Sequence, residues 1–188
     1  MIPFSKGELA VINDAIIDEI YYWKYEEKLQ AAKKWNGPYI NEPKIDKSTF
    51  FERTKQGRYI YPNVESTLAI MADGQFIGTV GSYWVDKNTN WLEIGIVIYD
   101  TKFWESGIGS EVFKLWVDYL FEQNFVHRLG ISTWSGNKRM IKLAMRVGMK
   151  EEACIRQARN YMMRLKWAYC VKNLSLIHIS EPTRQAEI

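Results

Sequence analysis

The residues best suited to chemistry lie in a glycine-containing turn, Trp104 to Ser110, which follows an apolar stretch and precedes an amphipathic one. The first N–H groups of a helix have no intrahelical acceptor, and the aligned peptide dipoles place partial positive charge there. Gly107 and Gly109 would let an anion approach the backbone closely, because neither carries a side chain. We therefore predict that the backbone amides of residues 106–110 bind a phosphate or diphosphate without needing a lysine.

Two common phosphate-binding loops do not fit this turn. A Walker-type loop requires Gly-Lys followed by Ser or Thr, whereas Gly109 is followed by Ser110 and Glu111. A dinucleotide-binding fold needs a third glycine three residues after Gly109, but Val112 stands there, and no repeated parallel βαβ unit follows. The sequence therefore argues against a nucleotide hydrolase and against a dehydrogenase.

Four predicted elements would position this turn. An apolar strand covers Trp91 to Tyr99, and the helix after the turn runs to about Asn124 with one apolar face that can dock on a sheet. A second strand follows from His127 to Trp134, and a second helix from Gly136 to Val147 begins at Asn137. The alternation of strands and helices predicts an α/β domain.

The N-terminal half is expected to add helices and a hairpin to this core. Residues Glu8 to Asn36 predict one or two helices after a short opening strand. Two strands, Glu65 to Met71 and Gln75 to Val85, are joined by Asp73-Gly74, a dipeptide that suits the positive backbone angles of a tight hairpin. This dipeptide is the strongest turn signal in the chain.

Composition limits the class of protein. The 188 residues are 47% hydrophobic, which is enough for one domain with one sizeable core. The net charge of +3 is not gathered into a run, so neither a nucleic-acid nor a membrane partner is expected. The two cysteines lack metal-ligand spacing, so no metal is expected. Because the opening of the chain has no signal-like apolar run, we expect a cytoplasmic protein. We expect it to be a monomer or a homodimer.

The order of these motifs resembles the RimJ/RimL-like branch of the GNAT N-acetyltransferase superfamily, over roughly residues 64–159. That superfamily's loop reads Gln/Arg-x-x-Gly-x-Gly/Ala, and Gly107 and Gly109 match its glycines. Trp104 stands in the first position, which removes a cationic or amide side chain but leaves the backbone cradle. The segment from Asn137 to Met149 is similar to the Asn-led helix of this branch, with Met140 and Met149 in place of the usual Ser and Phe.

The resemblance implies a mixed α/β GNAT fold, with a mostly antiparallel central sheet, one splayed parallel strand pair and flanking helices. It also implies acetyl-CoA as co-substrate, with its pantetheine arm paired to the backbone of residues 95–99 where the two strands part. Backbone N–H groups near Ile96 and Val97 could then stabilise an oxyanion, and Asn137 could bind the cofactor, cap its helix, or do both. The predicted cofactor-binding residues are Ile96, Val97, Ile98, Trp104, Ser106, Gly107, Ile108, Gly109, Ser110 and Asn137.

The implied reaction is direct attack of a primary amine on the thioester. The acceptor would be a protein N-terminus, such as that of a ribosomal protein, or a small amine. Glu93 is the predicted catalytic base, although a salt-bridged or solvent-facing strand residue is an equal interpretation. Tyr83 and Trp84 are predicted to line the acceptor groove, although a buried alternating strand also explains them. A non-catalytic acyl-CoA-binding or regulatory domain on the same fold is the alternative, favoured if Glu93 faces away from the cleft.

The end of the chain looks foreign to the domain, which we expect to cover residues 1–161. Residues 174–184 resemble a translated sequencing adaptor, so residues 174–188 are predicted to be a non-native tail. Residues 162–173 fit poorly as the closing strand of the family, but reading their codons one base earlier permits a sequence that resembles it. We therefore infer a frameshift between about Gln157 and Tyr161, with the alternative that 162–173 is a natural strand or helix. Loss of the closing strand would leave an unpaired sheet edge.

Overall fold

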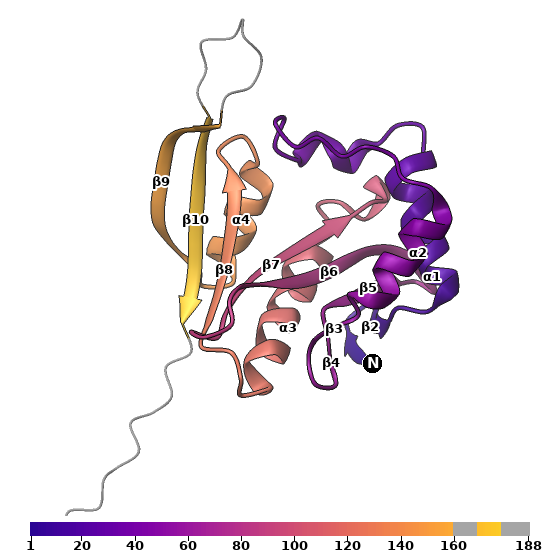
Figure 1. The fold of residues 1–188 in the computed structure, drawn as a ribbon, viewed down its shortest axis with the longest axis horizontal. Helices are drawn as coiled ribbons and strands as arrows, with labels where there is room; N and C mark the ends of the chain where they lie inside the picture. Colours follow the sequence, from indigo (N-terminus) through magenta and orange to yellow (C-terminus); the bar gives the residue numbers. More distant parts are fainter. Residues whose placement is uncertain (160–168, 178–188) are drawn as a thin grey trace, which may run out of the picture.

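The computed structural model describes residues 1–159 and 169–177, and its centre is a twisted sheet of eight strands (Figure 1). The strand order is β1-β2-β5-β6-β7-β8-β10-β9, and every neighbouring pair is antiparallel except β7 with β8. A separate small hairpin joins β3 to β4. The strands are β1 (Ile2–Phe4), β2 (Gly7–Val11), β3 (Tyr59–Tyr61), β4 (Val64–Glu65), β5 (Thr67–Ala72), β6 (Gln75–Asp86), β7 (Trp91–Ile98), β8 (Arg128–Trp134), β9 (Lys150–Arg159) and β10 (Tyr169–Ile177).

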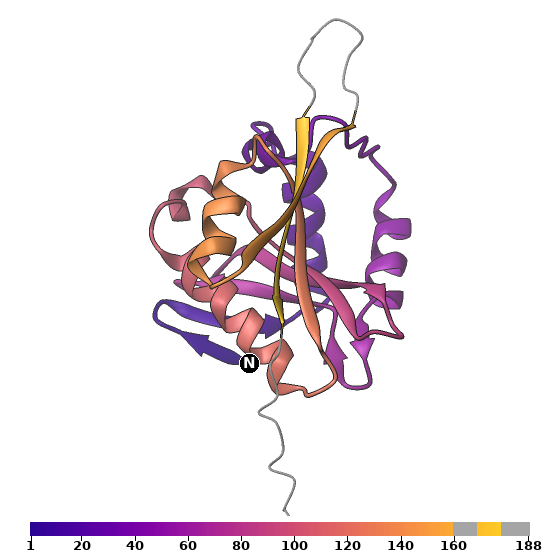
Figure 2. The same ribbon diagram turned by 90° about the vertical axis from the view of Figure 1, so that its left-hand side faces the viewer.

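Helices cover both faces of the sheet (Figure 2), with α3 and α4 on one face and α1 and α2 on the other. In the described part of the chain, no helix has the length and apolar character needed to cross a membrane. The helical segments are α1 (Asp14–Tyr21), the π-turn η1 (Tyr22–Glu26), the 3₁₀ turns η2 (Ala31–Trp35) and η3 (Thr101–Phe103), α2 (Lys47–Gln56), α3 (Ile108–Glu122) and α4 (Lys138–Arg146).

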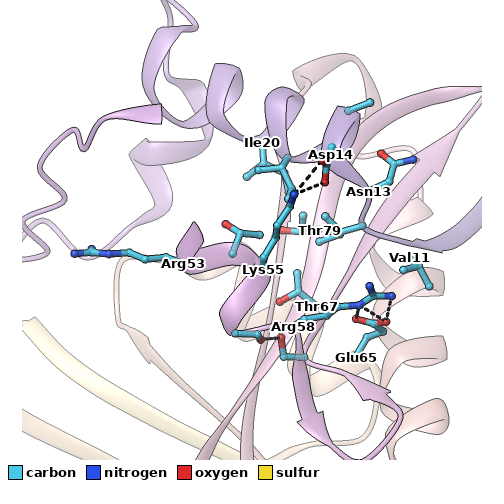
Figure 3. A pocket seen from close by; sticks show the side chains of 16 residues that line it. Val11, Asn13, Asp14, Ile20, Arg53, Lys55, Arg58, Glu65, Thr67 and Thr79 are labelled. Atoms are coloured by element: carbon cyan, nitrogen blue, oxygen red, sulfur yellow. Dashed lines mark hydrogen bonds and ion pairs between the residues drawn. The ribbon is translucent and has the colours of Figure 1, made fainter. Parts of the chain in front are cut away.

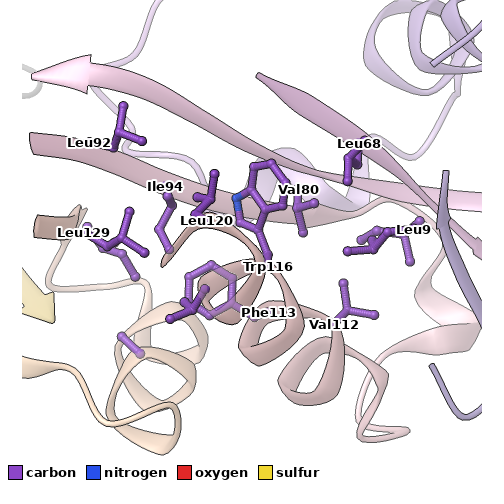
Figure 4. Packing of buried hydrophobic residues seen from close by; sticks show 14 of the residues in the cluster. Leu9, Leu68, Val80, Leu92, Ile94, Val112, Phe113, Trp116, Leu120 and Leu129 are labelled. Carbon is purple, nitrogen blue, oxygen red and sulfur yellow. The ribbon is translucent and has the colours of Figure 1, made fainter. Parts of the chain in front are cut away.

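The main core lies between α3 and the sheet, as Figure 4 shows. The apolar side chains of α3 recur every three or four residues, so they share one face of the helix, and Phe113, Trp116 and Leu120 on that face are fully buried. The indole N–H of Trp116 donates to the carbonyl of Gly81 at 3.2 Å, so its burial leaves no polar atom unsatisfied. This packing fixes the direction of α3, and therefore the direction in which the N–H groups at its N-terminus point.

Local sequence signals predicted much of this layout. Asp73 and Gly74 have φ angles of 50° and 75°, which confirms the hairpin turn between β5 and β6. The expected single opening strand is in fact a hairpin of β1 and β2, joined through β2 to β5. The predicted strand and helix ends around the turn differ from the observed ones by one or two residues, which is usual where elements fray.

A closing strand is present, so the expectation of an unpaired edge at β8 was wrong. Strand β10 pairs with β8 from Val171↔Trp134 to Ile177↔Arg128 and also pairs with β9. Leu174 is only 1% exposed and joins the main core, because the alternation Leu-Ser-Leu suits a strand with one buried face. Strand formation depends on this alternation alone and does not bear on the origin of the residues. On β9, Cys154 is disulfide-bonded, a bond that the expected reducing location does not favour.

Candidate active site

An opening in the sheet lies between β7 and β8, the parallel pair (Figure 1). The two strands are paired only at their start, and the last pair is Glu93 with Gly130. Beyond Glu93, β7 remains paired with β6 as far as Ile98 but no longer with β8. The structure therefore contains the splayed strand pair that the family resemblance implies, and Glu93 stands at its vertex.

The backbone of β7 beyond this vertex has one edge free of β8. The N–H of Tyr99 donates to the carbonyl of Ile77 on β6 at 2.8 Å. Because successive peptide groups of a strand point to opposite sides, the groups of Ile96 and Ile98 face the opening. The N–H of Val97 faces β6 instead, so the expectation that both Ile96 and Val97 offer oxyanion donors is corrected to Ile96 alone.

The predicted phosphate turn lies at the open end of β7. Residues 105–107 are exposed, whereas the side chain of Ile108 is 2% exposed and anchors the start of α3 in the core. Gly107 has a φ of 88°, a left-handed conformation that favours glycine, and a Cβ added there would meet no atom within 4 Å. A Cβ added at Gly109 would lie 3.5 Å from Cδ1 of Ile98, which shows how closely the helix start approaches β7.

Several polar groups of this turn already have partners within it. The indole N–H of Trp104 donates to the carbonyl of Ile98 at 2.9 Å, so this side chain ties the turn to β7. The hydroxyl of Ser106 donates to the carbonyl of Phe103 at 2.7 Å. The amide of Ser110 donates to the carbonyl of Gly107 at 3.0 Å, as in an ordinary first helical turn. Of the amides predicted to bind phosphate, that of Ser110 is therefore already hydrogen-bonded within the helix, whereas residues 105–107 are exposed.

Asn137 uses both polar atoms of its side chain. Its Oδ1 accepts the N–H of Met140 at 3.0 Å, which confirms its role as the N-cap of α4. Its Nδ2 donates to the carbonyl of Trp35 at 3.1 Å, and Nε1 of Trp134 donates to the same oxygen at 2.9 Å. These bonds attach η2 to the far side of the opening. A contact between Asn137 and the cofactor stays a prediction.

The carboxylate of Glu93 is held by two hydroxyl groups. The hydroxyl of Tyr83 on β6 donates to one carboxylate oxygen, and the hydroxyl of Ser132 on β8 donates to the other. Ser132 also lies 3.3 Å from Oδ1 of Asn173 on β10. Desolvation and the Glu93 carboxylate both raise the pKa of the Tyr83 phenol, so Tyr83 stays protonated and remains a donor. Sequence reasoning found Glu93 and Tyr83 but missed Ser132 and Asn173.

Trp84 does not line the face that carries Glu93, which corrects the prediction that it shares a groove with Tyr83. Trp84 pairs with the fully buried Leu92 and packs on the main core beneath the opposite face. Its indole N–H donates to the carbonyl of Ile60 at 2.9 Å. Because neighbouring strand residues point to opposite faces, Tyr83 and Trp84 could not both line one groove.

Two cavities lie on the α1 and α2 side of the sheet, and the smaller one adjoins the open end of β7. That cavity, of about 300 Å³, is bordered by Val97 and Tyr99 of β7, by Trp23, whose ring stacks on Tyr99 at 6.2 Å, and by η2. Desolvation of the half-buried Tyr99 raises its pKa to about 12, so its hydroxyl is neutral at working pH.

The larger cavity, of about 1020 Å³, lies over β5 and β6, away from the opening (Figure 3). Four of its charged groups form two ion pairs: Lys55 binds Asp14 at 2.9 Å, and Arg58 binds the mostly buried Glu65 at 2.8 Å. Size alone therefore does not mark the reactive site, because the smaller cavity is the one that Val97 and Tyr99 border at the open end of β7.

Residues 13–150 match the family profile described as acetyltransferase (GNAT) domain. The chain belongs to this family. GNAT acetyltransferases transfer an acyl group from acetyl-CoA, so the chain is an acyltransferase with acetyl-CoA as its co-substrate. The matched segment contains the splayed strands, the turn, Glu93 and Asn137.

Solved structures of other GNAT proteins share the fold. A RimL ribosomal L7/L12 α-N-protein acetyltransferase in complex with coenzyme A has a TM-score of 0.74 at 15% identity, covering 94% of this chain and 97% of that one. The spermidine N-acetyltransferase of Vibrio cholerae, in complex with CoA and spermine, has a TM-score of 0.72 at 16% identity, covering 90% and 94%. A GNAT acetyltransferase from Bacillus anthracis has a TM-score of 0.69 at 12% identity, covering 94% and 97%. No curated protein matches the chain by sequence. The predicted GNAT fold is thus confirmed.

Proposed function

We propose that this GNAT domain, as a member of the RimJ/RimL-like branch, transfers acetyl from acetyl-CoA to a primary amine, with Glu93 as the general base. The observation that carries the proposal is the position of Glu93, at the vertex of the opening and on the face that also presents Val97 to the smaller cavity. Tyr83 and Ser132 fix its two oxygens, so the carboxylate is oriented before substrate arrives. The alternative of a non-catalytic binding domain is favoured if Glu93 faces away from the cleft, and the position of Glu93 at the vertex instead supports a catalytic role.

The chain's own residues supply a proton acceptor and an oxyanion donor for the reaction. The neutral amine nitrogen forms a bond to the thioester carbon, the carbon–sulfur bond breaks, and coenzyme A leaves as the thiol or thiolate. The proton lost by the amine passes to Glu93, directly or through one water molecule. The N–H of Ile96, which faces the opening, can stabilise the oxyanion that forms during attack.

The opening also fits the cofactor. The turn at Gly107 has open space where a side chain would stand, which leaves room for a diphosphate at the start of α3. The backbone of Ile96, and the N–H of Ile98, whose carbonyl already accepts the Trp104 indole, can pair with the amides of a pantetheine arm. Acetyl-CoA would then supply an activated acetyl group beside Glu93.

The acceptor is proposed to be a protein N-terminus, such as that of a ribosomal protein, or a small amine. Two proteins that share the fold are a ribosomal-protein N-acetyltransferase and a spermidine N-acetyltransferase, and both have amine acceptors. The cavity of about 300 Å³ beside Val97 and Tyr99 is the site we assign to the acceptor end that bears the amine.

The substitution Glu93→Gln tests the base. It keeps the size of the side chain but removes the proton acceptor, so kcat should fall about 100-fold. The loss should be greatest at low pH, where an unassisted amine is protonated. Steady-state thiol release with a panel of amines, measured across pH, checks this expectation.

Glu52→Gln is the matched control, because Glu52 is an exposed residue of α2 and should leave turnover unchanged. A pH profile of Glu93→Gln that parallels the wild-type profile would remove Glu93 as the base. If the wild-type chain released no thiol with any amine, the transfer reaction itself would be rejected.

A further inference from the structure

The phosphate turn carries no cationic side chain, so the proposed cofactor site lacks a positive charge within the turn itself. Trp104 occupies the loop position where the family pattern has Gln or Arg, and its neighbour Glu105 adds a negative charge on an exposed side chain. An acidic group beside a diphosphate is unfavourable unless a cation neutralises it. Helix α3 also carries Glu111 in its first turn, but that carboxylate is turned toward Ser5, which donates both its N–H and its hydroxyl.

A cation from α4 lies at this position. The guanidinium carbon of Arg139 is 4.5 Å from the ring centre of Trp104 and 4.8 Å from that of Trp35. The two indole rings meet edge to face, with centres 6.5 Å apart, so Arg139 sits in the corner between them. One of its nitrogens lies 2.6 Å from Oε1 of Glu105. Stacking on rings uses the face of a guanidinium and leaves its in-plane N–H groups available, and one of them engages Glu105.

Two further observations point the same way. Arg146 lies two turns further along α4, and its Nη1 is 3.5 Å from Oγ of Ser110, so α4 directs one arginine to each end of the turn. The indole N–H of Trp35 is buried and has no hydrogen-bond partner within the described residues, which leaves a second unused donor beside Arg139. Planar, bidentate donors of this kind are the usual partners of phosphate oxygens.

We propose that Arg139 binds the diphosphate of acetyl-CoA and replaces, from α4, the cationic side chain that the turn lacks. The inference rests on the proposed use of acetyl-CoA at this turn. Trp35 and Trp104 hold the guanidinium over the turn, and its bond to Glu105 offsets the one acidic group there. Specificity for a cofactor with a diphosphate, rather than for any thioester, would then depend on a residue outside the loop motif.

The test compares ligands that differ in the diphosphate. Arg139→Gln should weaken the binding of coenzyme A by about 30-fold in isothermal titration, a typical loss for one charge-assisted pair. The kcat/KM for S-acetylpantetheine, which has no diphosphate, should change less than about twofold. Arg139→Lys keeps the charge but loses the planar arrangement of N–H donors. Its affinity for coenzyme A should therefore lie between that of the wild type and that of Arg139→Gln.

Arg53→Gln is the matched control. Arg53 is an exposed residue of α2 that lines the larger cavity, away from the phosphate turn, and its removal changes net charge equally (Figure 3). It should leave the affinity for coenzyme A unchanged. Thermal unfolding of each variant shows whether its fold is intact.

The outcomes separate the two proposals. If wild-type chain binds no coenzyme A, the cofactor assignment and this inference fall together. If wild type binds it but Arg139→Gln binds equally well, only the role of Arg139 is overturned. An equal loss of activity with acetyl-CoA and with S-acetylpantetheine would assign Arg139 to holding the loop and would also overturn the proposal.

Discussion

Glu93 is held from both sides, by Tyr83 of the preceding strand and by Ser132 of the strand across the opening. A carboxylate with two fixed donors has little freedom to rotate, so a proton acceptor of defined position is maintained at the vertex. The bond to Ser132 also spans the gap between β7 and β8 just beyond their last paired residues. Ser132 is therefore expected to act as a positioning residue rather than as a group that contacts substrate.

Ser132→Ala tests this role. Loss of one hydrogen bond of about 1 kcal/mol should lower kcat roughly fivefold and leave the KM for acetyl-CoA unchanged. Steady-state kinetics with varied acetyl-CoA separates the two parameters. Ser82→Ala is the control, because Ser82 lies on the opposite face of β6 and donates to the carbonyl of Ser66 at 3.2 Å. A change in KM alone for Ser132→Ala would place this hydroxyl in cofactor binding instead.

Residue types could be predicted from the sequence more readily than their partners. Glu93 was identifiable because a carboxylate within an apolar strand is unusual, and Asn137 because an Asn before a helix is a common cap. Ser132 and Arg139 could not be found, since their partners are 39 and 34 positions away along the chain. The prediction that Trp84 lines the acceptor groove was wrong, because neighbouring strand residues point to opposite faces and Trp84 therefore points away from the face of Tyr83.

At the scale of elements, the strand, turn and helix that form the cofactor site are positioned by different forces. Helix α3 is fixed by the burial of Phe113 and Trp116, and the turn is tied to β7 by Trp104. Gly107 makes the connection possible, since its left-handed conformation would strain any residue with a side chain. These signals are local, so the order of elements could be predicted from the sequence.

Gly107→Ala tests the turn. The left-handed conformation should cost about 1 kcal/mol of unfolding free energy, and the strained turn should weaken coenzyme A binding severalfold. Chemical denaturation and isothermal titration measure the two effects separately. Gly148 is a matched control, because it has a φ of 93° and equally open space but follows α4. Gly148→Ala should lose similar stability but keep its affinity for coenzyme A. If Gly148→Ala lost affinity as much as Gly107→Ala does, backbone strain alone would explain the loss in both variants.

The attachment of η2 to the far side of the opening could not be predicted, because it depends on contacts made only in the folded chain. The carbonyl of Trp35 accepts two side-chain bonds, from Trp134 and Asn137, and its ring contacts Trp104. One short segment thus links the loop between α1 and α2, the phosphate turn and α4. Any movement of η2 would change the geometry of both the cofactor turn and the smaller cavity, which η2 also borders.

At the scale of the whole molecule, the sheet is completed by β10, which overlaps the segments predicted to be out of frame or non-native. We still propose that residues 162–173 are out of frame and that 174–188 are an adaptor-derived tail. The nucleotide sequence of the gene across codons 157–161 decides this, and an intact reading frame there would reject it. The observed strand is compatible with either origin, because the gap beside β8 accepts any segment with the right alternation of apolar and polar residues.

Leu174→Ala tests whether this segment stabilises the domain whatever its origin. Leu174 is 1% exposed within the main core, so its truncation should lower the unfolding free energy by about 3 kcal/mol. Ile177 on the same strand is 46% exposed, and Ile177→Ala should cost less than about 1 kcal/mol. Denaturant unfolding of both variants makes the comparison. Equal and small losses would mean that β10 does not close the sheet in solution, which would leave the edge of β8 available for pairing with another chain.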